Sequence, residues 1–271
     1  MRKLFTVFKS RKKDKKCLKI LGIGNSFTED GTEYLFDVAK NSPDSDIIVG
    51  RTVIGGCSLD MHWNYIQNNE ANYTFSIWYP TYKYDSEKKV TLEEGLKKEK
   101  WDVIVIQQVS NEAGDSETYS KLDSIIDYIK KYCPKAKIMW QMTWAYPQDS
   151  DHGGFSKYNC DQLTMYNAIV DTYKNTVSKR DAIEDVIPTG TAVQNLRTAL
   201  GDTLNRDSLH LSYDYGRYTA ALCWYKAITK RSIDEIYWVP EEYEFISENL
   251  EKIKQAVNTA IEKPFDITKI N

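Results

Sequence analysis

Ser26, His210 and Asp207 are the residues of this 271-residue chain whose types and spacing suggest chemistry. A serine hydroxyl is a weak nucleophile until a base removes its proton, and that base works best when a third group fixes its tautomer. Asp207 lies three residues before His210, a separation at which a carboxylate in a turn can reach the imidazole Nδ1. The three residues are therefore candidates for the nucleophile, base and orienting acid of an acyl-transfer reaction.

Ser26 stands at the junction of a predicted strand and a predicted helix. The apolar run 18–23 is rich in residues that suit a buried strand, and Gly24 and Asn25 permit a sharp turn after it. Thr28 and the two acidic residues that follow it are typical of a helix start. Such a junction can present a nucleophile, but the alternative for Ser26 taken alone is a simple helix cap.

Only three histidines occur in the chain, so the candidates for the base are few. His210 and Asp207 precede a helix that we expect to begin near Ser212, and they therefore belong to a loop, where catalytic groups are often presented. His62 lies inside a predicted helix and is interpreted as a packing or pocket-rim residue, and His152 lies in an Asp-rich and Gly-rich loop without an evident partner. The alternative for His210 is a surface histidine with an incidental acid nearby.

Acyl transfer also requires hydrogen-bond donors aimed at the developing oxyanion. Gly56 offers a backbone N–H at a second strand-to-helix turn, Asn111 offers a side-chain amide after a third strand, and the N–H of Ser26 completes the set. The simpler interpretations are a positive φ at Gly56 and a capped turn at Asn111. Gln107 and Gln108, at the end of the same third strand, are alternative donors.

The elements that must position these residues alternate along the chain. Apolar segments predict strands at 18–23, 47–53, 103–106, 138–140 and 182–187, with helices between them. This alternation predicts a parallel five-stranded sheet inside a three-layer α/β/α sandwich. Ligands bind at the carboxyl ends of the strands in such sheets, and Ser26, Gly56, Asn111 and the loop of Trp144 all follow strand ends.

One segment, at about 72–91, departs from this pattern because aromatic and polar residues alternate along it. It predicts an inserted antiparallel hairpin with its turn near 85–88, or a tighter bend at Pro80 and Thr81. Farther along, a long helix is predicted from about 158 to 178. The length suits one large α/β domain, so residues 17–271 are expected to form a single domain.

The composition limits the classes of protein to which the chain can belong. Apolar residues make up 41% and charged residues 28%, and the net charge of −3 offers no case for a nucleic-acid partner. Five scattered cysteines indicate neither a disulfide framework nor a zinc site. No segment approaches the roughly 20 apolar residues of a membrane span.

The first sixteen residues carry eight Lys or Arg and no apolar run long enough for an export signal. We interpret residues 1–16 as a disordered basic leader and expect a cytoplasmic location. A periplasmic or secreted location is the alternative if the N-terminus is mis-assigned.

The order of the motifs resembles that of the SGNH, or GDSL-like, hydrolases. The resemblance covers about residues 18–230 and rests on four blocks, which are Gly24-Asn25-Ser26, the glycine turn Gly55-Gly56, Asn111 after an apolar strand, and Asp207-x-x-His210. It implies a flavodoxin-like sheet and an ester hydrolase without a cofactor or metal. It also implies that Ser26 is the nucleophile, His210 the base and Asp207 its orienting acid, with the N–H groups of Ser26 and Gly56 and the amide of Asn111 as the oxyanion hole.

Two of the blocks depart from the family pattern. Asn25 stands where the family usually has Asp, and the third block reads QQVSNEA in place of G-x-N-D, so Gln107 or Gln108 remains an alternative to Asn111. This variant block, the GGCSL turn and the aromatic hairpin together resemble a poorly characterised subgroup found in gut Bacteroidetes.

We expect a serine esterase that removes small acyl groups, acetyl above all, from a carbohydrate or a similar polar substrate. The ester chemistry follows from the proposed triad, whereas the sugar rests on the habit of the resembled family and on the 19 Tyr and 7 Trp of the chain. The aromatic residues expected to line the cleft are Trp63, Trp78, Tyr79, Tyr82 and Trp144, with core packing as the alternative. A catalytically inactive carbohydrate-binding protein and a lipase or thioesterase are the competing interpretations, and the oligomeric state stays open.

Overall fold

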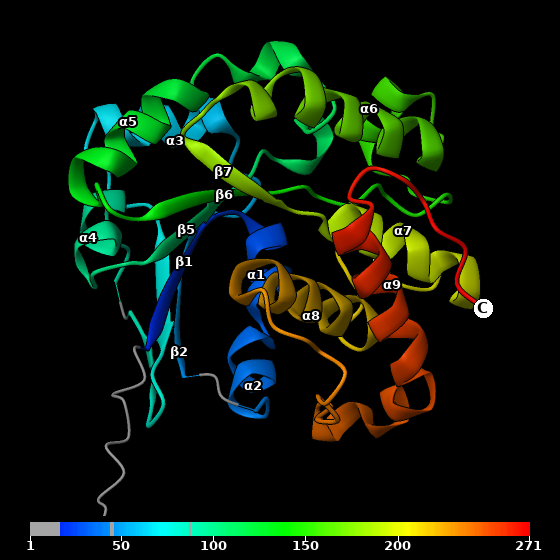
Figure 1. The fold of residues 1–271 in the computed structure, drawn as a ribbon. Coiled ribbons are helices and arrows are strands. Elements are labelled where there is room, and N and C mark those ends of the chain that lie inside the picture. Colours follow the sequence, from blue (N-terminus) through cyan, green and yellow to red (C-terminus); the bar gives the residue numbers. More distant parts are fainter. Residues whose placement is uncertain (1–16, 44–45, 87) are drawn as a thin grey trace, which may run out of the picture.

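A seven-stranded sheet with the strand order β4-β3-β2-β1-β5-β6-β7 forms the centre of the computed structural model (Figure 1), which describes residues 17–43, 46–86 and 88–271. The predicted leader, residues 1–16, lies outside the described residues. The strands are β1 Leu18–Gly24, β2 Ile47–Val53, β3 Thr74–Trp78, β4 Lys83–Asp85, β5 Val103–Ile106, β6 Lys137–Gln141 and β7 Ile183–Ile187. The neighbours β2, β1, β5, β6 and β7 are all parallel, which confirms the five predicted strands and their flavodoxin-like order.

The predicted hairpin is also confirmed, and it widens the sheet. β3 pairs antiparallel with β2, and β4 pairs antiparallel with β3 at the edge. The turn is the tighter of the two predicted bends, because the N–H of Tyr79 donates to the carbonyl of Tyr82 at 2.8 Å across Pro80 and Thr81. The turn first expected near 85–88 is therefore wrong. The antiparallel direction of β3 carries the chain from the carboxyl end of β2 back toward its amino end.

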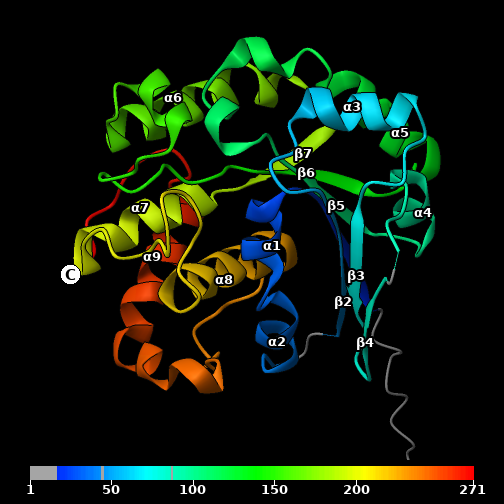
Figure 2. The same cartoon turned by 180° about the vertical axis from the view of Figure 1, so that it is seen from behind.

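Helices cover both faces of the sheet, as the parallel connections require (Figures 1 and 2). They are α1 Ser26–Thr32, α2 Leu35–Lys40, α3 Leu59–Gln67, α4 Leu92–Lys97, α5 Leu122–Tyr132, α6 Gln162–Asn175, α7 Thr189–Leu200, α8 Tyr215–Thr229 and α9 Leu250–Glu262. Helices α1, α2, α7, α8 and α9 lie on one side, and α3, α4, α5 and α6 lie on the other. Short 3₁₀ segments complete the structure, namely η1 Ser110–Glu112, η2 Ser116–Tyr119, η3 Gly153–Tyr158, η4 Val177–Lys179 and η5 Glu241–Asn249.

The core lies on both faces of the sheet. All four residues of β5 are buried, which explains why this strand reads as an unbroken apolar run. Helix α5 instead buries one stripe, made of Leu122, Ile125, Ile126 and Ile129. Within the ranges that the structure describes, no helix combines the length and the apolar character needed to cross a membrane.

Two predicted helix starts lie too early in the sequence. Asn159 and Cys160 have φ values of 58° and 51°, so the long helix expected from about 158 begins only at Gln162. Asp161 caps it by accepting a hydrogen bond from the N–H of Thr164 at 2.7 Å. The helix expected near Ser212 begins at Tyr215, after a capping Asp214.

Candidate active site

Asn25, at the carboxyl end of β1, ties together the backbone around Ser26. Its Oδ1 accepts the N–H of Phe27 at 3.0 Å and so caps α1, of which Ser26 is the first residue. The same Oδ1 accepts the Nε2 of Gln107 at 2.7 Å, and the Nδ2 of Asn25 donates to the carbonyl of Cys57 at 3.0 Å. One buried amide thus joins the ends of β1 and β5 to the glycine turn after β2. The sequence analysis did not predict this linking role for Asn25. The signal for it was the amide in place of the usual aspartate, because an amide, unlike an ionised carboxylate, can donate to the Cys57 carbonyl.

The structure brings Ser26, His210 and Asp207 into one hydrogen-bonded chain. The Nε2 of His210 lies 2.8 Å from the Oγ of Ser26, and its Nδ1 lies 2.8 Å from the Oδ2 of Asp207. Ser26 and His210 are half-buried, whereas Asp207 is exposed. Ser26 begins α1, and the other two belong to the loop between α7 and α8, as the sequence predicted.

The loop backbone holds the carboxylate of Asp207 in place. Its Oδ1 accepts the N–H groups of Leu209 at 2.9 Å and of His210 at 2.7 Å. Partial burial raises the pKa of Asp207, but these backbone hydrogen bonds and the one from the His210 ring outweigh it and hold the pKa below its usual value. With Asp207 as the acceptor of a hydrogen bond from Nδ1–H of the His210 ring, Nε2 is the nitrogen that accepts the hydrogen bond of the Ser26 hydroxyl.

Trp144 packs between α1 and the loop that carries His210. Its ring stacks on Phe27 with the centroids 4.0 Å apart, and its Nε1 donates to the carbonyl of Leu209 at 2.8 Å. The side chain is fully buried. Trp144 therefore connects α1 to the loop of His210, and its predicted place on the substrate surface is corrected.

Three predicted oxyanion donors lie at this edge of the sheet with their N–H groups unused. Gly56 is exposed and has a φ of +65°, so its glycine freedom is needed for the turn. Asn111 is half-buried in η1 after β5. Among the residues that the structure describes, the N–H of Ser26, the N–H of Gly56 and the side-chain amide of Asn111 have no hydrogen-bond acceptor.

The alternative donors Gln107 and Gln108 are committed elsewhere. The Nε2 of Gln108 donates to the carbonyl and the Oγ1 of Thr118, at 3.1 and 3.0 Å. Its Oε1 accepts the N–H groups of Leu59 and Val109, both at 2.9 Å. Gln107 is bound to Asn25 and is likewise buried. The alternative of Gln108 as oxyanion donor is therefore wrong, and the role of Asn111 stays a prediction.

The hairpin aromatic residues do not reach this site. Trp78 pairs with Val49 on β2, and the hydroxyl of Tyr79 donates at 2.8 Å to Glu99, which pairs with Lys19 near the start of β1. Trp78 and Tyr79 thus lie toward the amino ends of the parallel strands, whereas Ser26 follows a carboxyl end. Tyr82 stacks on Tyr79. The predicted cleft role of these three is wrong because β3 runs antiparallel, while that of Trp63, half-buried on α3, stays a prediction.

The other two histidines are engaged away from Ser26. His62 is buried, its Nδ1 lies 2.9 Å from the hydroxyl of Tyr73, and burial lowers its pKa to about 4. The Nδ1 of His152 accepts the N–H of Gly154 at 3.1 Å. His210 is therefore the one histidine of the chain that contacts the Ser26 hydroxyl.

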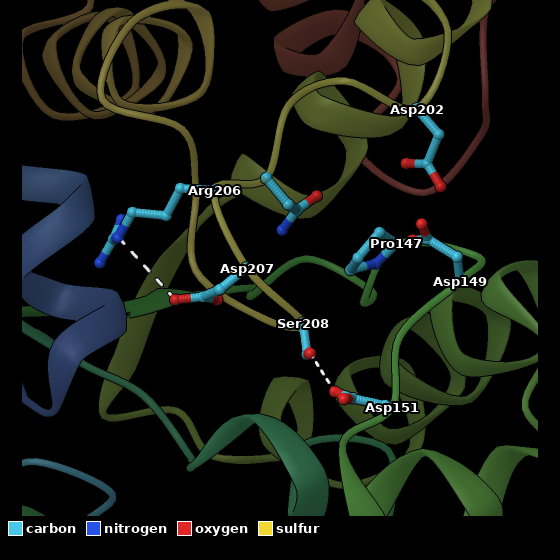
Figure 3. Close-up of a pocket in the computed structure, with 8 residues that line it drawn as sticks. Pro147, Asp149, Asp151, Asp202, Arg206, Asp207 and Ser208 are labelled. Carbon is cyan, nitrogen blue, oxygen red and sulfur yellow. Dashed lines mark hydrogen bonds and ion pairs between the residues drawn. The ribbon is translucent and has the colours of Figure 1, made fainter.

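A polar pocket of about 330 Å³ borders the triad loop (Figure 3). Its lining residues are Pro147, Asp149, Asp151, Asp202, Asn205, Arg206, Asp207 and Ser208. The hydroxyl of Ser208 donates to Asp151, so the loop after β6 is joined to the triad loop across the pocket. In the part of the chain that the structure describes, no three His, Cys, Asp or Glu side chains gather in a way that would hold a metal ion.

The sheet order and the Ser-turn at its carboxyl edge define an α/β protein of the SGNH hydrolase fold. The chain belongs to the family described as "Domain of unknown function (DUF4886)", which it matches over residues 19–260. A crystal structure of a DUF4886 family protein from Bacteroides uniformis is 36% identical, with a TM-score of 0.88 over 94% of this chain and 98% of that one.

Two more distant structures share the fold. A candidate SGNH hydrolase from Slackia heliotrinireducens is 19% identical, with a TM-score of 0.53 over 79% of this chain and 100% of that one. A candidate GDSL-like lipase from Parabacteroides merdae is 15% identical, with a TM-score of 0.50 over 80% and 98%. No curated protein matches the chain. The predicted resemblance to SGNH and GDSL-like hydrolases is confirmed at the level of the fold.

Proposed function

We propose that this protein is a serine esterase that removes small acyl groups, acetyl in the first place, from a neutral, polyhydroxylated alcohol such as a sugar. The observation that carries the proposal is the chain of two 2.8 Å hydrogen bonds from Asp207 through His210 to Ser26. A hydroxyl, an imidazole and a carboxylate in this order are the parts that nucleophilic acyl transfer requires.

In the proposed mechanism the Oγ of Ser26 attacks the ester carbonyl while the Nε2 of His210 takes its proton. The N–H groups of Ser26 and Gly56 and the amide of Asn111 donate to the resulting oxyanion. When the tetrahedral intermediate collapses, the bond to the alcohol breaks, and the imidazolium returns the proton to the leaving oxygen. Water, deprotonated by His210, then attacks the acyl-enzyme and releases the carboxylic acid and Ser26.

The pocket beside Asp207 supports a polar and uncharged alcohol. Besides Asp207 it presents the carboxylates of Asp149, Asp151 and Asp202, of which Asp202 is paired with Arg197. Arg206, a cation in the same lining, is shared between Asp30 and Asp207, so the lining remains acidic. Carboxylates accept hydrogen bonds from sugar hydroxyls, and they repel a substrate that carries its own carboxylate. This lining favours an acetylated neutral sugar over an acetylated acidic one.

A largely apolar cavity of about 450 Å³ lies far from Ser26. It is lined by Trp101 and Ala136, which precede β5 and β6, together with the ends of α4 and α5. Ser26 lies at the opposite edge of the sheet, after the carboxyl end of β1. A long acyl chain attached to Ser26 would therefore not enter this cavity.

The test is hydrolysis of p-nitrophenyl acetate by the wild type, Ser26→Ala and His210→Ala, with folding checked by circular dichroism. Both variants are expected to lose about 10⁴-fold to 10⁶-fold in kcat, as a broken triad does. Ser247→Ala, an exposed serine on η5, serves as the matched control and keeps wild-type activity. A fluorophosphonate probe should label the wild type and Ser247→Ala, and should label neither Ser26→Ala nor, at a comparable rate, His210→Ala, because the probe reacts with an activated serine. Unchanged hydrolysis by Ser26→Ala, or a wild type that neither hydrolyses nor labels, would refute the proposal.

The substrate class is tested separately by comparing kcat/KM. The kcat/KM for an acetylated neutral xylo-oligosaccharide should be higher than the kcat/KM for acetylated sialic acid or for p-nitrophenyl octanoate. Equal values for the neutral and the acidic sugar would remove the sugar-specific part of the proposal, and preference for the octanoate would indicate a lipase or thioesterase.

A further inference from the structure

A buried carboxylate lies one helical turn beyond Ser26. Asp30 of α1 is fully buried, and three donors converge on it. The Nη1 of Arg206 lies 2.9 and 3.2 Å from its two oxygens, the Nε of Arg217 lies 2.8 Å from Oδ1, and the N–H of Leu211 lies 2.9 Å from Oδ2. Both arginines are largely buried as well. Asp30 thus joins α1, the triad loop and α8.

Arg206 connects this carboxylate to the backbone of the triad loop. Its backbone N–H donates to the carbonyl of His210 at 3.0 Å, and its side-chain Nη1 also donates to the carbonyl of Leu211. Its Nε lies 4.0 Å from the Oδ2 of Asp207, the oxygen that contacts the His210 ring, and Figure 3 shows this ion pair with the side chain pointing toward α1. Arg206 is therefore shared between Asp30 and the triad acid.

Tyr213 covers the outer side of the two arginines. Its ring centroid lies 4.7 Å from the guanidinium carbon of Arg206 and 4.7 Å from that of Arg217. The hydroxyl of Tyr34, which follows α1, donates to the carbonyl of Tyr213 at 2.8 Å. The ion pairs of Asp30 are thereby shielded from water, which strengthens them.

Two hydrogen bonds run in parallel between the same two segments. Ser26 and Asp30 are four residues apart on α1, and His210 and Leu211 are adjacent in the loop. The contact of Asp30 with Leu211 is buried, whereas the contact of Ser26 with His210 is partly open to solvent. The buried hydrogen bond between Asp30 and Leu211 is therefore placed to fix the distance between Ser26 and His210, whose own hydrogen bond is only partly buried.

We infer that Asp30, Arg206 and Arg217 form a positioning cluster that sets the Ser26 to His210 geometry. The inference rests on the proposed function, because it assigns the cluster a role in the turnover of that site. The alternative is that the cluster only stabilises the fold, as a buried ion pair can, although such pairs are often neutral for stability. A positioning role predicts a loss of kcat in molecules that remain folded, whereas a structural role does not.

Asp30→Asn is the informative variant because it keeps the shape and removes acceptors. One amide oxygen and one NH₂ group would then face three donors, so the loop carrying Leu211 is released. We expect kcat for p-nitrophenyl acetate to fall on the order of 10²-fold with KM within about threefold, since a 1 Å misplacement has such an effect. Fluorophosphonate labelling of Ser26 should slow by the same factor.

Lys254→Met is the matched control for loss of a buried charge. Lys254 on α9 is 2% exposed and donates to the carbonyl of Asp234 at 2.8 Å, without a contact to the triad loop. It should lower stability and leave kcat per folded molecule unchanged. If Asp30→Asn does not fold, Arg217→Lys and Arg217→Met take its place. The lysine variant keeps the charge and should retain several-fold more of kcat than the methionine variant.

Amide hydrogen exchange separates this inference from the proposed function. Asp30→Asn should speed exchange at His210 and Leu211, and Lys254→Met should not. A wild type without activity or labelling would refute the proposed function, and the exchange result would still decide whether the cluster holds the loop. Three results would overturn the inference. They are a wild-type kcat in folded Asp30→Asn, an equal kcat in the two Arg217 variants, and an unchanged exchange rate at Leu211.

Discussion

Replacing Asn25 with Asp tests whether the turn before Ser26 requires an amide. The change keeps the shape of the side chain and both hydrogen bonds that Oδ1 accepts, from the N–H of Phe27 and the Nε2 of Gln107. It exchanges Nδ2, which donates to the carbonyl of Cys57 at 3.0 Å, for an oxygen. Two acceptors then face each other in a site where the residue is 1% exposed.

The expected loss follows from these contacts. One hydrogen bond is removed, at about 1 kcal/mol, and the buried Cys57 carbonyl and one buried carboxylate oxygen are left without a donor, at about 1–3 kcal/mol more. We therefore expect Asn25→Asp to lower the free energy of unfolding by about 2–4 kcal/mol at pH 7. The deficit should shrink at acid pH, because a protonated carboxyl can again donate to the Cys57 carbonyl.

Urea unfolding followed by tryptophan fluorescence at pH 7 and pH 5 measures this effect. Asn41→Asp is the matched control, because the Nδ2 of Asn41 also donates to a backbone carbonyl, that of Asp37 at 2.9 Å, but in an exposed position. It should change the free energy of unfolding by less than about 1 kcal/mol. Equal stability of Asn25→Asp and the wild type at pH 7 would refute the reasoning, and so would a deficit that grows on acidification.

Two further predictions concern Asn111 and His62. A Cβ added at Gly154 would lie 2.5 Å from the Cβ of Asn111, whereas one at Gly153 would meet open space. Gly154→Ala should therefore lower kcat for p-nitrophenyl acetate on the order of tenfold by displacing the Asn111 amide; Gly153→Ala should not, and equal kcat values would contradict this. Because burial lowers the pKa of His62 to about 4 in the folded state, the unfolded chain binds more protons between about pH 6.5 and 4. Stability should fall as pH drops through this window, by up to about 3 kcal/mol from His62, and urea titrations of His62→Gln should lack that part of the slope.

The fold was predictable because its signals are local. β5 is buried at every position, and a strand covered on both faces reads as an unbroken apolar run. The hairpin was visible in its alternation. The start of α6 was misplaced because the left-handed residues Asn159 and Cys160 carry no strong sequence signal for that conformation.

The contacts among Ser26, His210 and Asp207 were predictable for two different reasons. Asp207 and His210 are three residues apart, so one turn brings them together. Ser26 and His210 are 184 residues apart, and their meeting was expected only from the chemistry of a serine–histidine–aspartate triad and from the resemblance to the SGNH hydrolases. Residue type was informative here because few residues can serve as base.

The sequence by itself determined the order of the strands' apolar runs, the turn at Ser26 and the local pair of Asp207 and His210. Only the tertiary structure decided which of the remaining polar and aromatic side chains are free to act. Gln108 is engaged by Leu59 from 49 residues away, and Asp30 by Arg206 from 176 residues away. Trp78 lies toward the amino ends of the parallel strands, away from Ser26, because β3 runs antiparallel to β2. A side chain's availability depends on partners that are distant in sequence, and residue type and spacing do not record those partners.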